Sequence, residues 1–207
     1  MVKNKLYIKC ANYDFKSLLN RLGYAYFEKG NYNLNIIGIR AENNGVVTNL
    51  FDDILVVIFN DSNNNTIRRI YNITTEPGTY YVSKKLLNPK GAAILVPGQY
   101  RGCWQLGMHQ GKYLALCQKK AVKVYRDNNK NSRYDLIPKT IENGIFGINI
   151  HRASQYKTVT NIDAYSAGCQ VFNNIKDYDE FIRICTKQAE LYGNSFTYTL
   201  INEKDLV

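Results

Sequence analysis

One histidine and one cysteine of this chain stand in sequence contexts that suit nucleophilic catalysis. His151 ends the apolar run 146–150, so a titratable ring is expected at the tip of a buried strand. Cys169 follows in the segment Ser166-Ala167-Gly168-Cys169-Gln170, between a loop and the next apolar strand. A neutral imidazole within hydrogen-bond reach of a thiol can take its proton, and the imidazolium then stabilises the thiolate. The residue types therefore predict a Cys–His nucleophile, if the fold brings the two side chains together.

The small residues before Cys169 fit the same chemistry. Ala167 and Gly168 leave room for a substrate carbonyl, and backbone N–H groups at Gly168 and Cys169 could form an oxyanion hole. Ser166, or a backbone carbonyl near it, is expected to orient the imidazole. The structural alternative stays open, because a cysteine is more often a buried apolar residue and a lone histidine more often serves the fold.

These residues resemble the motif of the L,D-transpeptidase catalytic domain, in which a His is followed by a loop and a Ser/Thr-His-Gly-Cys segment. His151 matches the first His, and Ser166, Gly168 and Cys169 match the later positions. The Ser-Ala-Gly-Cys-Gln version is similar to that of phage-encoded relatives, and residues 146–172 carry nearly all of the likeness. Residues 74–78 and 92–100 are assigned to the same phage type. Two positions depart from the motif: its second His is Ala167 here, and an Arg that positions a substrate carboxylate is Val171.

The resemblance implies acyl transfer through a thioester on peptidoglycan stem peptides, with no cofactor. It makes Cys169 the nucleophile and His151 the base and then the acid, with Ser166 and Gly168 completing the catalytic set. Whether an amine or water resolves the thioester is left open, so the enzyme could be a transferase or a hydrolase. Arg152 is expected to replace the missing Arg. The full set expected to contact substrate is Arg152, Asn149, Tyr165, Gln170, His109 and Trp104. For Trp104 and the segment 101–118, a hairpin with a packed tryptophan is an equal alternative.

Two other readings of function remain, a non-catalytic protein and a basic nucleic-acid-binding domain, the latter supported only by net charge. A non-catalytic wall-binding or virion structural protein could have kept the fold and lost the activity, as the two departures suggest. The formal net charge of +10 favours polyanionic partners in general. However, the densest basic patch, Lys119, Lys120 and Lys123, has the pattern of a solvated face, and no nucleic-acid motif accompanies it. We therefore expect peptidoglycan as the partner and no nucleic acid, and leave the oligomeric state open.

One polar segment could bind a metal. Asp127, Asn129, Asn131 and Asp135 place oxygen-bearing side chains at alternate positions, as in the first half of a calcium loop. Ser132 stands where the loop needs Gly, and Pro138 stands where it needs Glu. A polar hairpin turn is therefore favoured over a metal site. The five cysteines are odd in number and include no CxxC pair, which argues against a disulfide framework and a structural zinc site.

The remaining sequence predicts a mainly β domain, a sandwich or barrel of the L,D-transpeptidase type, with a short N-terminal helix and a C-terminal helix. Asp14 is expected to cap the first helix and Asp177 to begin the second, which should run to residue 192. Strands are expected at 34–39, 54–59, 66–73, 92–96, 113–117, 121–125, 145–150, 170–172 and 195–201. We expect one domain over residues 1–207, of which residues 1–50 could be an N-terminal elaboration.

The N-terminus and the apolar runs bear on location. The first ten residues carry positive charge without the apolar core of a signal peptide, and the longest apolar run is 54–59, far too short to span a bilayer. We therefore expect synthesis in the cytoplasm without a signal peptide and no membrane span. A substrate in the bacterial wall would then be reached on release from the cell or from within a virion.

Overall fold

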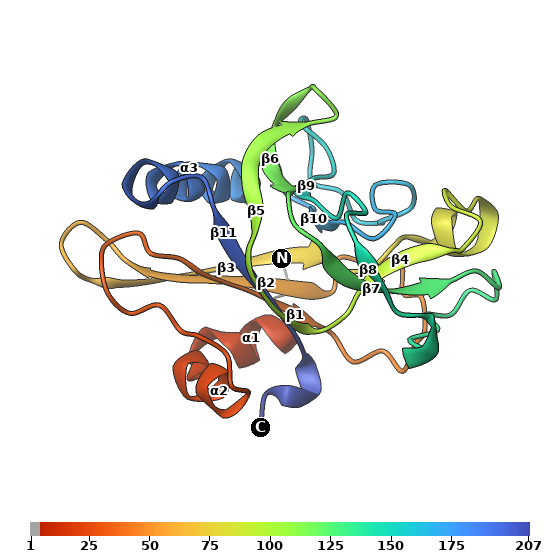
Figure 1. Ribbon diagram of the computed structural model, residues 1–207, viewed down its shortest axis with the longest axis horizontal. Coiled ribbons are helices and arrows are strands. Elements are labelled where there is room, and N and C mark those ends of the chain that lie inside the picture. Colours follow the sequence, from red (N-terminus) through yellow and green to blue (C-terminus); the bar gives the residue numbers. More distant parts are fainter. Residues whose placement is uncertain (1–4) are drawn as a thin grey trace.

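Eight strands close into a barrel in the computed structural model, which describes residues 5–207 (Figure 1). The mainly β class expected from the sequence is confirmed. Around the barrel the order is β1-β11-β5-β6-β9-β10-β3-β2. The strands are β1 (Asn35–Arg40), β2 (Asp53–Asn60), β3 (Thr66–Thr74), β5 (Gly98–His109), β6 (Tyr113–Gln118), β9 (Ile150–Arg152), β10 (Gln170–Phe172) and β11 (Phe196–Asn202).

A smaller sheet and a few helices surround the barrel. The sheet has the order β4-β7-β8 and lies to the right of the barrel in Figure 1. Helices α1 and α2 lie below the strands in that view, and α3 lies at the upper left, beside β5 and β11. The bounds are β4 (Ala92–Leu95), β7 (Val122–Asp127), β8 (Glu142–Gly144), α1 (Lys5–Ala11), α2 (Phe15–Arg21) and α3 (Ile175–Tyr192), with a π-helix at Tyr80–Lys84 and 3-10 turns at Pro138–Thr140 and Glu203–Asp205.

Strands β1 and β2 are buried on both faces, which explains their continuous apolar sequences. Their inward side chains, such as Ile36 and Leu55, join the barrel core together with Phe181 of α3. Their outward side chains, such as Ile37 and Val56, pack in a second core with the residues of α1 and α2. Close packing inside the barrel also requires Gly38, where a Cβ would lie 1.9 Å from the hydroxyl oxygen of Tyr198.

Both expected helices are present, with one boundary corrected. The carboxylate of Asp14 accepts a hydrogen bond from the Ser17 N–H and caps α2, as predicted. Helix α3 begins two residues before Asp177, because the Asn174 side chain accepts hydrogen bonds from the N–H groups of Lys176 and Asp177. It ends at Gly193, whose φ is 84°. Helix α1 and the π-helix were not predicted.

The expected strand at 145–150 is wrong. Residues 145–149 form an irregular segment, and β9 begins only at Ile150. The Gln118 side chain accepts hydrogen bonds from the N–H groups of Phe146 and Ile148, at 3.1 and 3.0 Å. The Trp104 indole N–H donates to the Ile148 carbonyl at 2.7 Å. Side chains thus satisfy backbone groups that a strand would pair, and Gly147 adopts a φ of 74°.

The other predicted strands are present within a residue or two, whereas β5 and β8 were not predicted. Strand β5 runs to His109, so most of the segment expected to contain a loop is strand. Strand β1 lies inside residues 1–50 and pairs with both β2 and β11, so this segment includes part of the barrel. Residues 1–4 of the same segment lie outside the described residues. Within residues 5–207, no helix is long and apolar enough to cross a membrane.

Candidate functional site

A short parallel ladder brings His151 and Cys169 to one face of the barrel wall. In this ladder β9 pairs with β10, and Val171 lies opposite His151. Side chains alternate between the two faces of a strand, so His151, Val171 and Cys169 share a face. Ile150 and Phe172, on the opposite face, belong to the barrel core. The register therefore explains how residues far apart in sequence reach one place.

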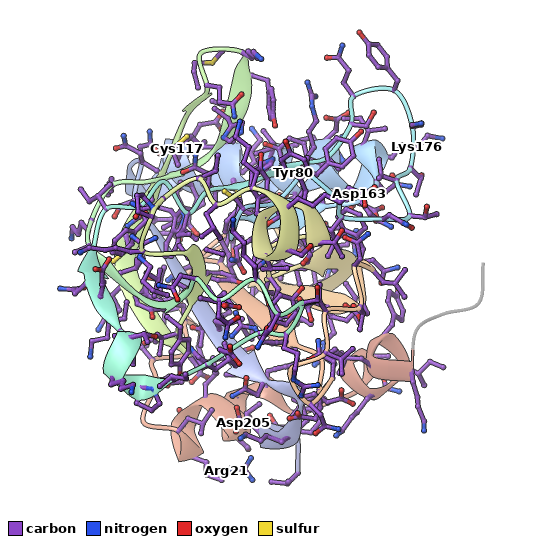
Figure 2. The ribbon with its side chains drawn as sticks, turned by 90° about the vertical axis from the view of Figure 1, so that its right-hand side faces the viewer. Arg21, Tyr80, Cys117, Asp163, Lys176 and Asp205 are labelled. Carbon is purple, nitrogen blue, oxygen red and sulfur yellow. The ribbon has the colours of Figure 1, made fainter. Side chains whose placement is uncertain are left out.

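The shared face borders a cavity of about 570 Å³. Tyr80 and Asp163, labelled in Figure 2, each precede a residue of its lining. The π-helix therefore supplies one part of the rim and the loop before β10 supplies another. Of the expected site residues, the cavity is lined by Cys169, His151, His109, Asn149 and Tyr165.

Hydrogen bonds fix the orientation of the His151 ring. Its Nδ1 lies 2.9 Å from the carbonyl oxygen of Arg152 and 3.3 Å from the Tyr113 hydroxyl, which itself donates to that carbonyl at 3.2 Å. A carbonyl oxygen can only accept, so the neutral ring carries its proton on Nδ1 and its Nε2 is an acceptor. The sequence predicted that Ser166, or a carbonyl near it, would orient the ring. The group that orients it is instead the Arg152 carbonyl in β9.

Both candidate reacting groups are neutral at pH 7. Burial raises the pKa of the Cys169 thiol to about 11, and a backbone hydrogen bond from Asn149 offsets this only in part. Burial, followed by the nearby His109, lowers the pKa of His151 to about 4, against the opposing effect of the Arg152 carbonyl. The thiol is directed at the Gly147 carbonyl oxygen, 3.3 Å away. The arrangement suits a thiol that loses its proton during attack, with a neutral imidazole as the base.

Ser166 and Gly168 shape the turn that presents Cys169. The Ser166 hydroxyl donates to the Cys169 carbonyl at 2.9 Å and accepts from the Gly168 N–H at 3.1 Å. Gly168 has a φ of 127°, and a Cβ there would lie 1.8 Å from the Ala93 carbonyl oxygen in β4. The glycine is thus required by its backbone conformation and by the close approach of β4. Its N–H is already bonded, so the oxyanion hole expected from the sequence keeps only the Cys169 N–H.

Three residues expected to contact substrate lie elsewhere. Trp104 is fully buried in the barrel core, which corrects its assignment to the wall of a groove and supports the packed alternative. Gln170 is also fully buried, where its side chain accepts from the Tyr198 hydroxyl at 2.8 Å and donates to the Gly168 carbonyl at 3.3 Å. The Arg152 guanidinium lies over the Tyr113 ring, 4.1 Å from its centroid, and bonds Gln155 instead of lining the cavity.

The oxygen-rich segment after β7 forms a polar turn. The side-chain oxygens of Asn129 and Asn131 accept hydrogen bonds from N–H groups two residues later, and both amide NH2 groups donate to the Asp135 carboxylate. Asp127 accepts from the Asp135 N–H at 3.4 Å. These oxygens therefore serve the turn. Within residues 5–207, no group of three or more His, Cys, Asp or Glu residues is arranged to hold a metal ion.

Arg126 in β7 is a site residue that sequence reasoning missed. It is the only charged residue among the described residues that line the cavity. Its guanidinium bonds Glu142 at 2.9 Å and the Gly91 carbonyl at 3.2 Å, and lies 4.7 Å from the centroid of the Phe146 ring. No local motif marks this arginine, because it belongs to the small sheet and reaches the cavity only through the tertiary fold.

Comparison with known proteins leaves the family open. No protein-family model, curated protein or solved structure matches this chain.

Proposed function

We propose that the chain catalyses cysteine-dependent acyl transfer on peptidoglycan stem peptides, as a phage lysin or a virion-associated wall-modifying enzyme. One observation carries this proposal: the Cys169 thiol and the His151 ring line the same cavity, with the ring held by its Nδ1 so that Nε2 can accept a proton. The L,D-transpeptidase resemblance of residues 146–172 supplies the class of reaction and the substrate.

The proposed reaction uses two proton transfers in each half. The Cys169 sulfur attacks an amide carbonyl carbon while its proton passes to Nε2 of His151, and the carbonyl π pair moves to oxygen. The tetrahedral species collapses, the C–N bond breaks, and the imidazolium returns the proton to the leaving amine. An amine or water then attacks the thioester, gives its proton to His151, and the departing sulfur recovers it.

Arg126 supports the choice of an anionic peptide. Its Nη2 has no partner among the described residues, while Nε and Nη1 are held by Glu142 and Gly91. A fixed guanidinium at a cavity wall suits a carboxylate, which stem peptides carry. Arg126 therefore takes the role that the sequence had given to Arg152. The variant Arg126→Gln should raise the KM for stem peptides more than it lowers kcat, whereas Arg152→Gln should change KM little.

A second candidate, a non-catalytic wall-binding or virion structural protein, is favoured by the neutral thiol. Burial raises the pKa of Cys169 to about 11, as expected of an inert buried cysteine. Such a protein would bind wall fragments without changing them.

The test is incubation of the purified chain with defined muropeptides, with products read by mass. Loss of a terminal residue, a new cross-link and a broken cross-link each identify a different reaction. Cys169→Ala should abolish turnover, whereas Cys117→Ala, a matched change at another partly buried cysteine, should retain it. Turnover by Cys169→Ala would overturn the proposal, and binding without turnover by the native chain would favour the second candidate.

A further inference from the structure

The two histidines of the chain stack on each other in the cavity. Their ring centroids are 4.2 Å apart and their planes differ by 18°. His109 comes from the end of β5 and His151 from β9, and both rings line the cavity. In each histidine the ring nitrogen with a hydrogen-bond partner is Nδ1. The partner is the Asn149 side-chain amide for His109 and the Arg152 carbonyl for His151.

Asn149 determines which nitrogen of His109 carries the proton. Its Oδ1 accepts a hydrogen bond from the Gln118 N–H at 2.9 Å, so its Nδ2 is the atom that lies 3.1 Å from His109 Nδ1. An amide NH2 only donates, so His109 Nδ1 is the acceptor and the neutral ring carries its proton on Nε2. His151, whose Nδ1 donates to a carbonyl, has the opposite tautomer. The stack therefore presents one acceptor Nε2 and one donor Nε2–H.

The donor is free to meet a ligand. Among residues 5–207, neither Nε2 has a hydrogen-bond partner, and neither is among the buried polar atoms without one, so both remain accessible in the cavity. Each ring has the other histidine as a titratable neighbour. The other titratable or charged groups near the two rings are Tyr113, Lys112 and Arg152. Burial and then Lys112 lower the pKa of His109, so the ring offers a neutral N–H donor at pH 7.

We propose that His109, through Nε2–H, donates a hydrogen bond to the carbonyl oxygen of the acyl group attacked by Cys169, and that Asn149 is the positioning residue that fixes its tautomer. This inference rests on the proposed function. The Gly168 N–H is bonded to Ser166, so the Cys169 N–H alone would otherwise stabilise the oxyanion. A second donor supplies the missing interaction as negative charge forms on oxygen, and no proton is transferred to or from His109.

The tautomers can be read directly by ¹⁵N NMR. The chain has two histidines, so two ring systems appear in long-range ¹H–¹⁵N spectra. We expect the Nε2–H form for His109 and the Nδ1–H form for His151 at pH 7, with His151→Asn assigning the signals. In Asn149→Asp, the side chain can still accept from Gln118 but presents an oxygen to His109, so the His109 proton should move to Nδ1. A native His109 with its proton on Nδ1 would overturn the inference.

Two substitutions of His109 separate donation from stacking. His109→Gln keeps an N–H donor near the Nε2 position and loses the ring, whereas His109→Phe keeps a ring on His151 and loses the donor. If donation matters, His109→Phe should lower kcat by about 10²-fold, as loss of one oxyanion donor does elsewhere, and His109→Gln should recover a large part of that loss. Asn149→Asp should lower kcat similarly with a small change in KM.

The outcomes distinguish this inference from the proposed function. If the native chain turns over muropeptides and Cys169→Ala does not, but His109→Phe equals the native chain, only the inference fails. If His109→Phe is active and His109→Gln is not, the ring acts by stacking and the inference is again overturned. If the native chain turns over no muropeptide, the proposed function fails, and the role given to His109 fails with it.

Discussion

Two groups of buried and half-buried polar side chains differ in the way their hydrogen bonds are used. The cavity cluster contains Cys169, His151, His109 and Asn149 and borders the cavity. The sealed cluster contains Arg40, Asp53, Thr75 and Glu76, all of which are buried. In both clusters polar groups are removed from water, which is unfavourable unless protein groups replace the hydrogen bonds to water. The first group consists of neutral residues at pH 7, whereas the second includes the arginine cation of Arg40.

The sealed cluster is closed by contacts within the protein. The Nε atom of Arg40 lies 3.3 Å from a carboxyl oxygen of Glu76, and Arg40 donates to the carbonyls of Thr75 and Leu95 at 3.1 and 3.0 Å. Asp53 accepts from the N–H groups of Ala41 and Thr75 at 2.7 and 2.6 Å. These bonds join β1, β2, β4 and the end of β3. The arrangement fixes the ends of several strands.

The cavity cluster instead holds each ring by one nitrogen and leaves the other accessible. In the sealed cluster nearly every polar group is bonded within the protein, and among the described residues only Nη1 of Arg40 lacks a partner there. The comparison teaches that polar groups paired mostly within the protein mark a structural network, whereas half-paired neutral groups beside a cavity mark a candidate reactive site. The predictions below test this distinction.

The largest effect on stability is expected when an arginine is replaced by methionine in the sealed cluster, compared with the same replacement at the cavity. Arg40→Met leaves the buried Asp53 carboxylate without its nearby cation and the Thr75 and Leu95 carbonyls without their donor, and should lower the free energy of unfolding by about 3–5 kcal/mol. Arg126→Met removes a cation whose partner, Glu142, is more exposed and also binds Lys90, so the loss should be about 1 kcal/mol or less. Urea unfolding of both variants at pH 7 measures the difference. Equal losses of unfolding free energy in the two variants would show that the sealed cluster stabilises the fold no more than the Arg126 contacts do.

The second prediction uses the opposite pKa shifts of the two clusters. The pKa of His151 is lowered to about 4, so the unfolded chain binds more protons between about pH 4 and 6.5, and stability from this residue rises with pH. Burial raises the pKa of Glu76 to about 8, against the effect of Arg40. The folded chain therefore binds more protons above about pH 4.3, and stability from Glu76 falls as pH rises toward 8.

Urea unfolding at several pH values measures both slopes. Relative to His151→Asn, the native chain should gain on the order of 3 kcal/mol between about pH 4 and 6.5. Relative to Glu76→Gln, it should lose stability from about pH 4.5 to 8. Slopes of the same sign for the two variants would contradict the opposite pKa shifts of His151 and Glu76.

The sequence was informative where local pattern determines structure. The apolar runs of β2 and β3 and the turn at residues 60–65 between them were predictable, because alternation, apolar content and turn residues are local properties. The Asp14 cap was predictable for the same reason. The candidate Cys169 and His151 were found through a short motif, and the geometry places them on one cavity.

Other features depend on contacts between distant segments. Strands β9 and β10 have three residues each, too few to reveal their parallel pairing by pattern. The Gln118 side chain holds residues 146–148 out of strand geometry from another part of the chain. Arg126 reaches the cavity from the small sheet. Burial of Trp104 and Gln170 likewise depended on the barrel closing around them, so neither could be distinguished from a site residue in advance.

The smallest effect concerns Ser166, which lies between the two kinds of polar group. Its hydroxyl is buried and engaged in the turn before Cys169, as in a structural network, yet this turn presents the proposed nucleophile. Ser166→Ala should lower the free energy of unfolding by about 1–2 kcal/mol, because two buried hydrogen bonds are lost. Ser154 is the matched control, because its hydroxyl accepts only from the Tyr156 N–H at an exposed hydrogen bond. Ser154→Ala should change the free energy of unfolding by no more than about 0.5 kcal/mol.

Chemical unfolding and muropeptide turnover, measured on the same samples, decide the role of Ser166. If the hydroxyl positions the turn, stability and turnover should fall together in Ser166→Ala. If turnover is lost while stability stays at the Ser154→Ala level, the hydroxyl acts on the reaction itself. In that case a fully paired side chain would belong to the reactive machinery, and pairing would no longer separate the two clusters.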